Sequence, residues 1–88
     1  MEELSDTTYD DLLKEELYLL NDDINSQQYV ATCLVMLIGL SPIEAMEIIQ
    51  TIENIGRAKI KEAYYFTLLE DKALFDDLNL KTEIEWIV

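Results

Sequence analysis

The chain has 88 residues, which is enough for one compact domain and too few for two. Acidic residues outnumber basic ones by 19 to 6, and the net charge of −13 disfavours binding to the phosphate backbone of a nucleic acid. Half of the residues are apolar, which argues against wholesale disorder. The charge favours a cationic partner, such as a basic protein surface or a free amino terminus, and solubility alone explains it equally well.

The single cysteine, Cys33, lies within an apolar run, so no disulfide can form within the chain and a reducing compartment is expected. Because the sequence contains no histidine to activate its thiol, we predict that Cys33 is a small core residue and not a nucleophile. The first residues are acidic where a secretory signal is basic. The apolar run over residues 30–40 is about half the length that spans a bilayer. We therefore expect a soluble, cytoplasmic protein that does not bind membranes.

Residues 1–16 are expected to form an acidic, flexible N-terminal extension, and residues 17–88 the folded domain. Leu4, Leu12 and Leu13 could form one face of a short helix in the extension. Such a helix would be marginal on its own, so we expect it to be ordered only on a partner.

The first strand is predicted over residues 17–20, which are apolar throughout and are expected to be buried on both faces or nearly so. Asn21, Asp22 and Asp23 end the strand, because these residue types favour turns and helix caps. A helix is predicted over residues 26–38, with Asn25 or Ser26 as its N-cap and a broad apolar stripe. Its expected C-terminal residue is followed by Gly39, which suits the left-handed conformation.

The second helix has the clearest start signal in the chain. Ser41 and Glu44 form a capping box, with Pro42 at the first helical position. Gly56 is expected to end this helix. Its apolar stripe consists of Ala45, Ile48, Ile49 and Ile52.

Residues 57–61 alternate strictly between basic and apolar side chains, which predicts a half-exposed strand. Ala58 and Ile60 are expected to face inward. Arg57, Lys59 and Lys61 are expected to face outward and to protect a sheet edge, a role we favour over that of a dedicated binding patch.

A third helix is predicted over residues 65–78, with Asn79 as its C-terminal cap. Three acidic residues of this helix, Asp71, Asp76 and Asp77, are expected to be solvated. Residues 81–88 alternate again and predict a last strand. One face of this strand carries Thr82, Ile84, Trp86 and Val88.

The order of elements is therefore strand, helix, helix, strand, helix, strand. This order predicts an α+β fold in which a three-stranded antiparallel sheet packs against three helices as a two-layer sandwich.

Several kinds of catalytic and metal-binding chemistry are disfavoured by what the sequence lacks. Without histidine, Ser-His and Cys-His catalysis and most zinc sites are excluded. Two glycines are too few for a glycine-rich phosphate loop. Asp22 and Asp23 do not continue into a calcium-binding loop, because its glycine and its last glutamate are missing. We therefore expect no enzymatic activity, no cofactor and no metal.

The chain resembles the ClpS adaptor family over about residues 17–72. The resemblance rests on Leu-Leu-Asn-Asp-Asp at residues 19–23, Ser-Pro-Ile-Glu-Ala at residues 41–45, and Ile-Glu-Asn-Ile-Gly-Arg-Ala at residues 52–58. Members of this family deliver proteins with bulky hydrophobic amino-terminal residues to a Clp AAA+ unfoldase and its protease. The resemblance thus implies a protein adaptor whose partners are the unfoldase's N-terminal domain and such substrates.

The resemblance also implies which residues carry the function. Asn21 and Asp22 would bind the substrate's α-amino group, and Asp23 would support the turn. The pocket for the first side chain would be lined by Asn25, Gln27, Val30, Ile49 and Ile52. Lys72 would contact the unfoldase, and the acidic extension would enter it.

Two positions depart from the family pattern. Glu53 replaces a histidine and could still accept a hydrogen bond from the ammonium group, although it places a second carboxylate near Asp22. Gln27 replaces an apolar residue, commonly methionine, at the entrance of the pocket.

These departures leave alternatives open. One is a regulatory protein that docks on a Clp unfoldase and has lost or altered its recognition of amino-terminal residues. Another is a small acidic domain in which Asn21, Asp22 and Asp23 merely cap the first helix.

Overall fold

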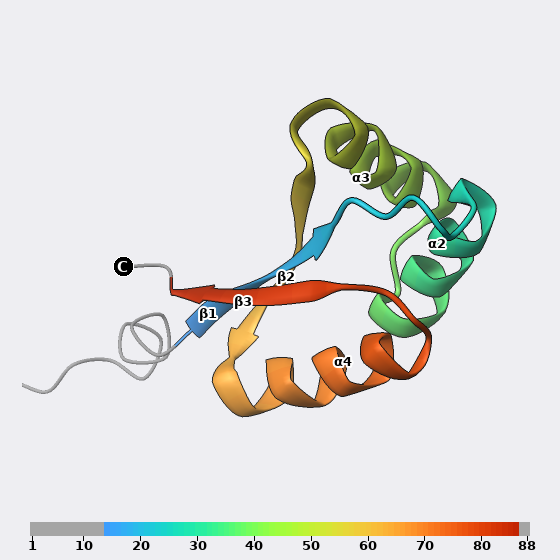
Figure 1. The fold of residues 1–88 in the computed structure, drawn as a ribbon. Coiled ribbons are helices and arrows are strands. Elements are labelled where there is room, and N and C mark those ends of the chain that lie inside the picture. Colours follow the sequence, from blue (N-terminus) through green and yellow to red (C-terminus); the bar gives the residue numbers. More distant parts are fainter. Residues whose placement is uncertain (1–13, 87–88) are drawn as a thin grey trace, which may run out of the picture.

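The computed structural model describes residues 14–86, which form three strands and three helices in the predicted order (Figure 1). The elements are β1 (Lys14–Leu20), α2 (Gln27–Cys33), the π-helical segment η1 (Leu34–Ile38), α3 (Pro42–Ile55), β2 (Arg57–Tyr64), α4 (Tyr65–Asp77) and β3 (Thr82–Trp86). The first strand begins three residues earlier than predicted. The predictions for Leu4, Leu12, Leu13 and Val88 lie outside the described residues.

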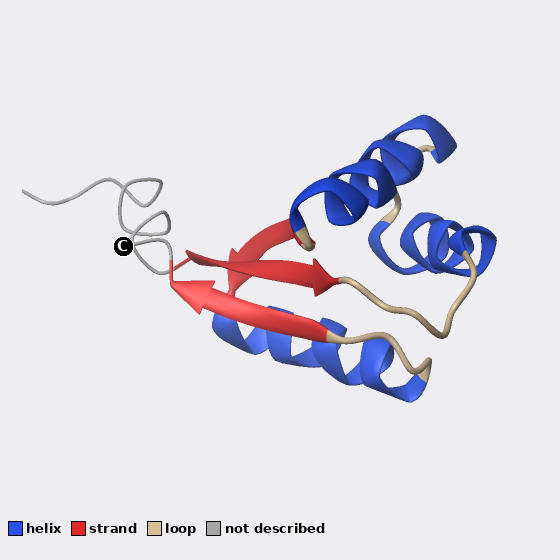
Figure 2. Ribbon diagram, turned by 45° about the horizontal axis from the view of Figure 1, so that its top comes forward, coloured by secondary structure: helices blue, strands red, loops and turns tan. Residues whose placement is uncertain are grey.

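The three strands form one antiparallel sheet in the order β2-β1-β3, so β1 is the central strand (Figure 2). The α4 helix runs beneath the sheet, whereas α2 and α3 lie together at the end where β1 ends. The predicted α+β fold is therefore confirmed, and so is the edge position of the strand that begins at Arg57.

A single hydrophobic core joins the inner face of the sheet to all the helices. Its largest fully buried side chains are Leu17, Leu19, Leu34, Leu68, Phe75 and Leu80. Cys33 is buried in this core as a free thiol, as predicted. The first strand was predicted to be buried on both faces or nearly so, and the structure buries only one face completely. Tyr18 and Leu20 are only half-buried, because the outer face of the sheet carries charged side chains instead of helices.

The bulge in the β1–β2 pairing corrects the prediction that all three basic residues of β2 face outward. Tyr18 pairs with Lys59 and Leu17 pairs with Lys61, so Ile60 is the additional residue on β2. Lys61 therefore shares the inner face with Leu17, and its Nζ lies 2.7 Å from Oδ2 of Asp71 on α4. Asp71 was predicted to be solvated, but its side chain is only 13% exposed because it forms this ion pair.

The predicted helix boundaries agree closely with the structure. The Ser26 hydroxyl accepts from the Tyr29 N–H and caps α2, and both bonds of the capping box of α3 are present. Gly39 and Gly56 have positive φ after their helices, and so does Asn79. The first predicted helix ends where expected, but its last five residues, Leu34–Ile38, form a π-helix.

Along the predicted apolar face of the last strand, the side chains become more exposed toward the C-terminal end. Thr82 is buried, Ile84 is half-buried, and Trp86 is 75% exposed. This gradient leaves an open groove near the end of β3. Among the described residues, no helix is long and apolar enough to cross a membrane.

Candidate functional site: a cavity at the end of the central strand

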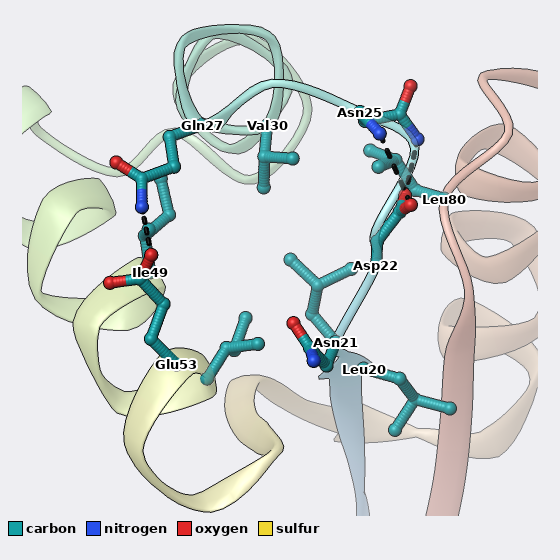
Figure 3. A pocket seen from close by; sticks show the side chains of 11 residues that line it. Leu20, Asn21, Asp22, Asn25, Gln27, Val30, Ile49, Glu53 and Leu80 are labelled. Carbon is teal, nitrogen blue, oxygen red and sulfur yellow. Dashed lines mark hydrogen bonds between the residues drawn. The ribbon is translucent and has the colours of Figure 1, made fainter.

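A cavity lies where β1 ends beside α2 and α3 (Figure 3). Two backbone hydrogen bonds hold the end of the strand in place. The Leu20 N–H donates to the Lys81 carbonyl at 3.0 Å, and the Asn21 N–H donates to the Gly56 carbonyl at 2.9 Å. The side chains that follow β1 are thereby fixed between the start of β2 and the segment that leads into β3.

The structure brings together all eight residues that the resemblance assigned to the substrate. They line one cavity of about 70 Å³ together with Leu19, Leu20 and Leu80: Asn21, Asp22, Asn25, Gln27, Val30, Ile49, Ile52 and Glu53. Val30, Ile49, Ile52, Leu19 and Leu80 are buried and form apolar walls. Leu80 was not predicted, because it follows α4 and no local pattern in the sequence links it to this site.

Asp22 is the most constrained polar residue of the cavity. Its Oδ1 accepts from the backbone N–H of Ile24 at 2.7 Å and of Asn25 at 3.2 Å, and its Oδ2 accepts from the Asn25 side chain. The Ile24 N–H, followed by the Asn25 amide, holds the pKa of the Asp22 carboxyl below its ordinary value. The prediction that Asp23 supports the turn is wrong, since Asp23 is exposed and these turn donors bind Asp22.

Asn25 connects the turn to the far end of α4. Its Nδ2 donates to Asp22 and also to the Asn79 carbonyl at 2.9 Å. The side chain thus lies at the cavity wall with its amide hydrogens already engaged. The bond to Asn79 connects the β1–α2 loop to the segment that follows α4 and so stabilises the position of the loop.

Asn21 differs from Asp22 in having an unengaged side chain. Its amide group extends into the space between β1 and α3 (Figure 3). Within residues 14–86, no hydrogen bond of this side chain is present, and the residue is exposed. Asn21 therefore offers an acceptor and donors to a ligand at the polar end of the cavity.

Gln27 and Glu53 close the opposite side of the cavity. Gln27 stands at the start of α2 and Glu53 in the last turn of α3, and the Gln27 Nε2 donates to the Glu53 Oε2 (Figure 3). Both side chains are exposed. The two departures from the family pattern are thus hydrogen-bonded to each other. We call this contact the Gln27–Glu53 bridge.

Lys72 does not lie at the cavity. It belongs to α4, where its Nζ donates to the Thr82 carbonyl at 2.8 Å and lies 3.8 Å from the Asp76 carboxylate. Its side chain lines the groove between α4 and β3. The residue that the resemblance assigned to the unfoldase is therefore separate from those assigned to the substrate.

The cavity has the chemistry of a binding site. Amide and carboxylate side chains stand on two sides of it, Asn21 and Asp22 on one and Gln27 and Glu53 on the other, and aliphatic side chains form its walls. Within the described part of the chain, no group of three or more His, Cys, Asp or Glu residues is arranged to hold a metal ion.

Comparison with protein families gives a match to the family described as "ATP-dependent Clp protease adaptor protein ClpS", over residues 14–79. No curated protein matches the chain. Among solved structures, the chain is similar to Agrobacterium tumefaciens ClpS2 bound to L-phenylalaninamide, with a TM-score of 0.75 and 20% sequence identity. The superposition covers 84% of this chain and 99% of that one. At this identity the likeness supports the fold.

Proposed function

Because the chain belongs to the ClpS family of ATP-dependent Clp protease adaptors, we propose that it delivers proteins to a Clp AAA+ unfoldase and selects them by their amino-terminal residue. In this proposal the cavity at the end of β1 binds that residue. The observation that carries the proposal is that Asn21, Asp22 and Glu53 line one cavity together with aliphatic side chains. The relative with L-phenylalaninamide supports it, since that ligand combines a free amino group with an apolar side chain.

The α-ammonium group would be bound by the polar end of the cavity. An ammonium group has three donors, and charge-assisted bonds to carboxylates are about twice as strong as neutral ones. Three of the roughly four acceptor positions of the Asp22 carboxylate are already occupied by the turn. We therefore assign the main acceptor to Asn21, with Asp22 contributing its remaining position and its charge. Glu53 would join them from the opposite side of the cavity once it leaves Gln27.

The first side chain of the substrate would lie against Val30, Ile49, Ile52 and Leu80. The cavity of about 70 Å³ is smaller than the ~150 Å³ of a protein cavity that binds benzene. An aromatic side chain therefore requires Gln27 to move away from Glu53. Leucine requires less movement, so this protein should accept leucine more readily than phenylalanine, tyrosine or tryptophan.

The test is a titration with four short peptides that begin with leucine or phenylalanine, each with a free or an acetylated amino terminus. We expect acetylation to weaken binding at least tenfold, because it removes the charge and two donors. Equal affinities of the free and acetylated peptides would exclude amine recognition. A stronger preference for phenylalanine than for leucine would contradict only the proposed size selection.

The second candidate is a Clp-docking regulator that does not bind amino termini. The specific observations in its favour are the Gln27–Glu53 bridge, which narrows the cavity, and the engagement of Asp22 within the turn. In this case the protein would contact the unfoldase through Lys72 and would leave the peptides unbound. Retention of the Clp unfoldase on the immobilised protein, together with no binding of any of the four peptides, would favour the regulator over the adaptor.

A further inference from the structure

The cavity at the end of β1 presents a carboxylate to a ligand from each of two opposite sides. Asp22 stands beside Asn21 on one side, and Glu53 stands beside Gln27 on the other (Figure 3). An α-ammonium group bound by Asn21 and Asp22 leaves Glu53 without a cationic partner as long as Glu53 stays on its own side. The arrangement therefore suits a ligand that carries a second cationic group.

Glu53 can accept this second cationic group, because the donor it now binds is neutral. Its Oε2 accepts from the Gln27 side-chain amide, and within residues 14–86 its carboxylate forms no ion pair. No lysine or arginine is among the residues that line the cavity. Charge-assisted hydrogen bonds are about twice as strong as neutral ones, so an ammonium group that reaches Glu53 displaces the Gln27 amide.

The space between the two sides suits an unbranched aliphatic chain. The cavity has a volume of about 70 Å³, and its buried walls include Val30, Ile49 and Ile52. A lysine side chain is narrow and can bury its methylene groups against apolar surface while its ammonium group stays among polar groups. Because Glu53 is exposed, an ammonium group beside it keeps part of its hydration and avoids the full cost of burying a charge.

We propose, on the basis of the function proposed above, that the preferred substrates begin with lysine and that Glu53 determines this preference. The α-ammonium group binds Asn21 and Asp22, the methylene groups lie against the aliphatic walls, and the side-chain ammonium group binds Glu53. Glu53 then binds the substrate from its own side of the cavity, in place of its bond to Gln27. A histidine at this position, as in the family pattern, is neutral or positively charged and does not attract a second ammonium group.

Three labelled peptides with free amino termini test this preference by fluorescence anisotropy. The first begins with lysine and then leucine. The second has norleucine, which keeps the straight chain without the amine, in place of the lysine. The third exchanges the first two residues, so that leucine comes first and the composition and net charge are unchanged. We expect the lysine-first peptide to bind about tenfold more tightly than either of the others, as one charge-assisted hydrogen bond provides.

The outcomes separate this preference from amine recognition itself. Equal affinities of the lysine-first and norleucine-first peptides would overturn the preference, whereas the proposed function would stand if acetylation weakened both. Equal affinities of the lysine-first peptide and its leucine-first isomer would also overturn it, since general attraction to the acidic surface would explain them. If none of the free peptides bound, the proposed function and the lysine preference would both be overturned.

Two variants test whether Glu53 is the residue that selects lysine. Glu53→Gln keeps the size of the side chain and removes its charge, so the ratio of the lysine-first to the norleucine-first affinity should fall from about tenfold to less than about twofold. The matched control Glu47→Gln removes one exposed charge from α3 outside the cavity lining and should leave this ratio unchanged. Parallel losses of affinity for both peptides in Glu53→Gln would overturn the role assigned to Glu53, because a general effect on the cavity lowers both affinities and leaves their ratio intact.

Discussion

The two ends of β1 each place a carboxylate beside apolar side chains, but the two carboxylates differ in their hydrogen bonding. Asp22, after the C-terminal end, accepts three hydrogen bonds from its own turn. Glu15, near the N-terminal end, is more deeply buried and has no such partner within the described residues. Residue type and burial therefore do not identify a carboxylate that binds a ligand. A carboxylate that can bind a ligand is identified by the acceptor positions that no group of the protein occupies.

This comparison changes how the cavity at the end of β1 is interpreted. The sequence draws attention to Asp22, because a carboxylate beside an apolar segment attracts a cation. In the structure Asp22 mainly fixes the turn, and the open acceptors belong to Asn21 and to Glu53 after it leaves Gln27. We therefore expect Asp22 substitutions to affect stability and Asn21 substitutions to affect binding.

The largest expected effect is on folding stability at Asp22. Asp22→Ala leaves the backbone donors of Ile24 and Asn25 without their acceptor. Because the site is partly exposed and water can replace the carboxylate, we expect the free energy of unfolding to fall by about 1–2 kcal/mol. Urea unfolding measures this change. The control Asp23→Ala should change it by less than about 0.5 kcal/mol, as is usual for exposed sites. Equal losses of unfolding free energy in Asp22→Ala and Asp23→Ala would refute the claim that Asp22, and not Asp23, stabilises the turn.

The second effect has the opposite sign and tests the other end of β1. Glu15→Leu removes a buried carboxylate and adds apolar surface to the groove between α4 and β3. We expect the free energy of unfolding to rise by about 1 kcal/mol, because apolar replacement of buried charges is often stabilising. The same urea experiment measures it. A loss of stability would mean that contacts within the folded chain stabilise the Glu15 carboxylate.

Much of the fold could be predicted from the sequence because its signals are local. The capping box at Ser41, the proline after it, and the glycines at positions 39 and 56 determine helix ends through nearby backbone geometry. The alternation of β2 predicts an edge strand for the same reason. These features need no knowledge of distant contacts.

The remaining features depend on contacts between residues far apart in the sequence. Lys61 faces inward because the partner strand pairs with β2 through a bulge, which no pattern within residues 57–61 specifies. Leu80 lines the cavity although it follows α4, about sixty residues after the end of β1. The Gln27–Glu53 bridge joins two helices, so sequence analysis found each residue unusual without indicating that they are bonded.

The third effect is a pH dependence located at Asp22. Its folded-state pKa lies below the ordinary value of 3.8, so the ionised carboxylate stabilises the folded state above pH 3.8. This contribution is lost as the pH falls through the folded-state pKa. Asp22→Asn should therefore be less stable than the unmodified protein at pH 7, and the difference should shrink as the pH falls through the folded-state pKa of Asp22. Glu44 and Glu85 also have lowered pKa values, so acid still destabilises the variant. A difference that is constant between pH 7 and pH 2 would contradict this assignment.

The smallest effect concerns the Gln27–Glu53 bridge. Gln27→Met removes the donor that holds Glu53, so opening of the cavity no longer breaks a hydrogen bond and Glu53 becomes available to an ammonium group. Since both side chains are exposed, we take the lower end of the usual net free energy of a hydrogen bond, about 0.5 kcal/mol. This corresponds to about twofold tighter binding of a peptide that begins with phenylalanine. Fluorescence anisotropy of a labelled peptide measures it.

The neighbouring residue offers a matched control for this last change. Gln28→Met places the same side chain one position further along α2, outside the cavity lining, and should leave peptide affinity unchanged. The gain in Gln27→Met should be larger for phenylalanine than for leucine, because the aromatic ring needs the wider opening. Weaker binding of the phenylalanine peptide by Gln27→Met would show that the bridge shapes the closed pocket and contributes to binding, which would reverse the role assigned to it. In that case we would still compare free and acetylated peptides. An equal loss of affinity on acetylation in Gln27→Met and Gln28→Met would support recognition of the ammonium group by Asn21 and Glu53.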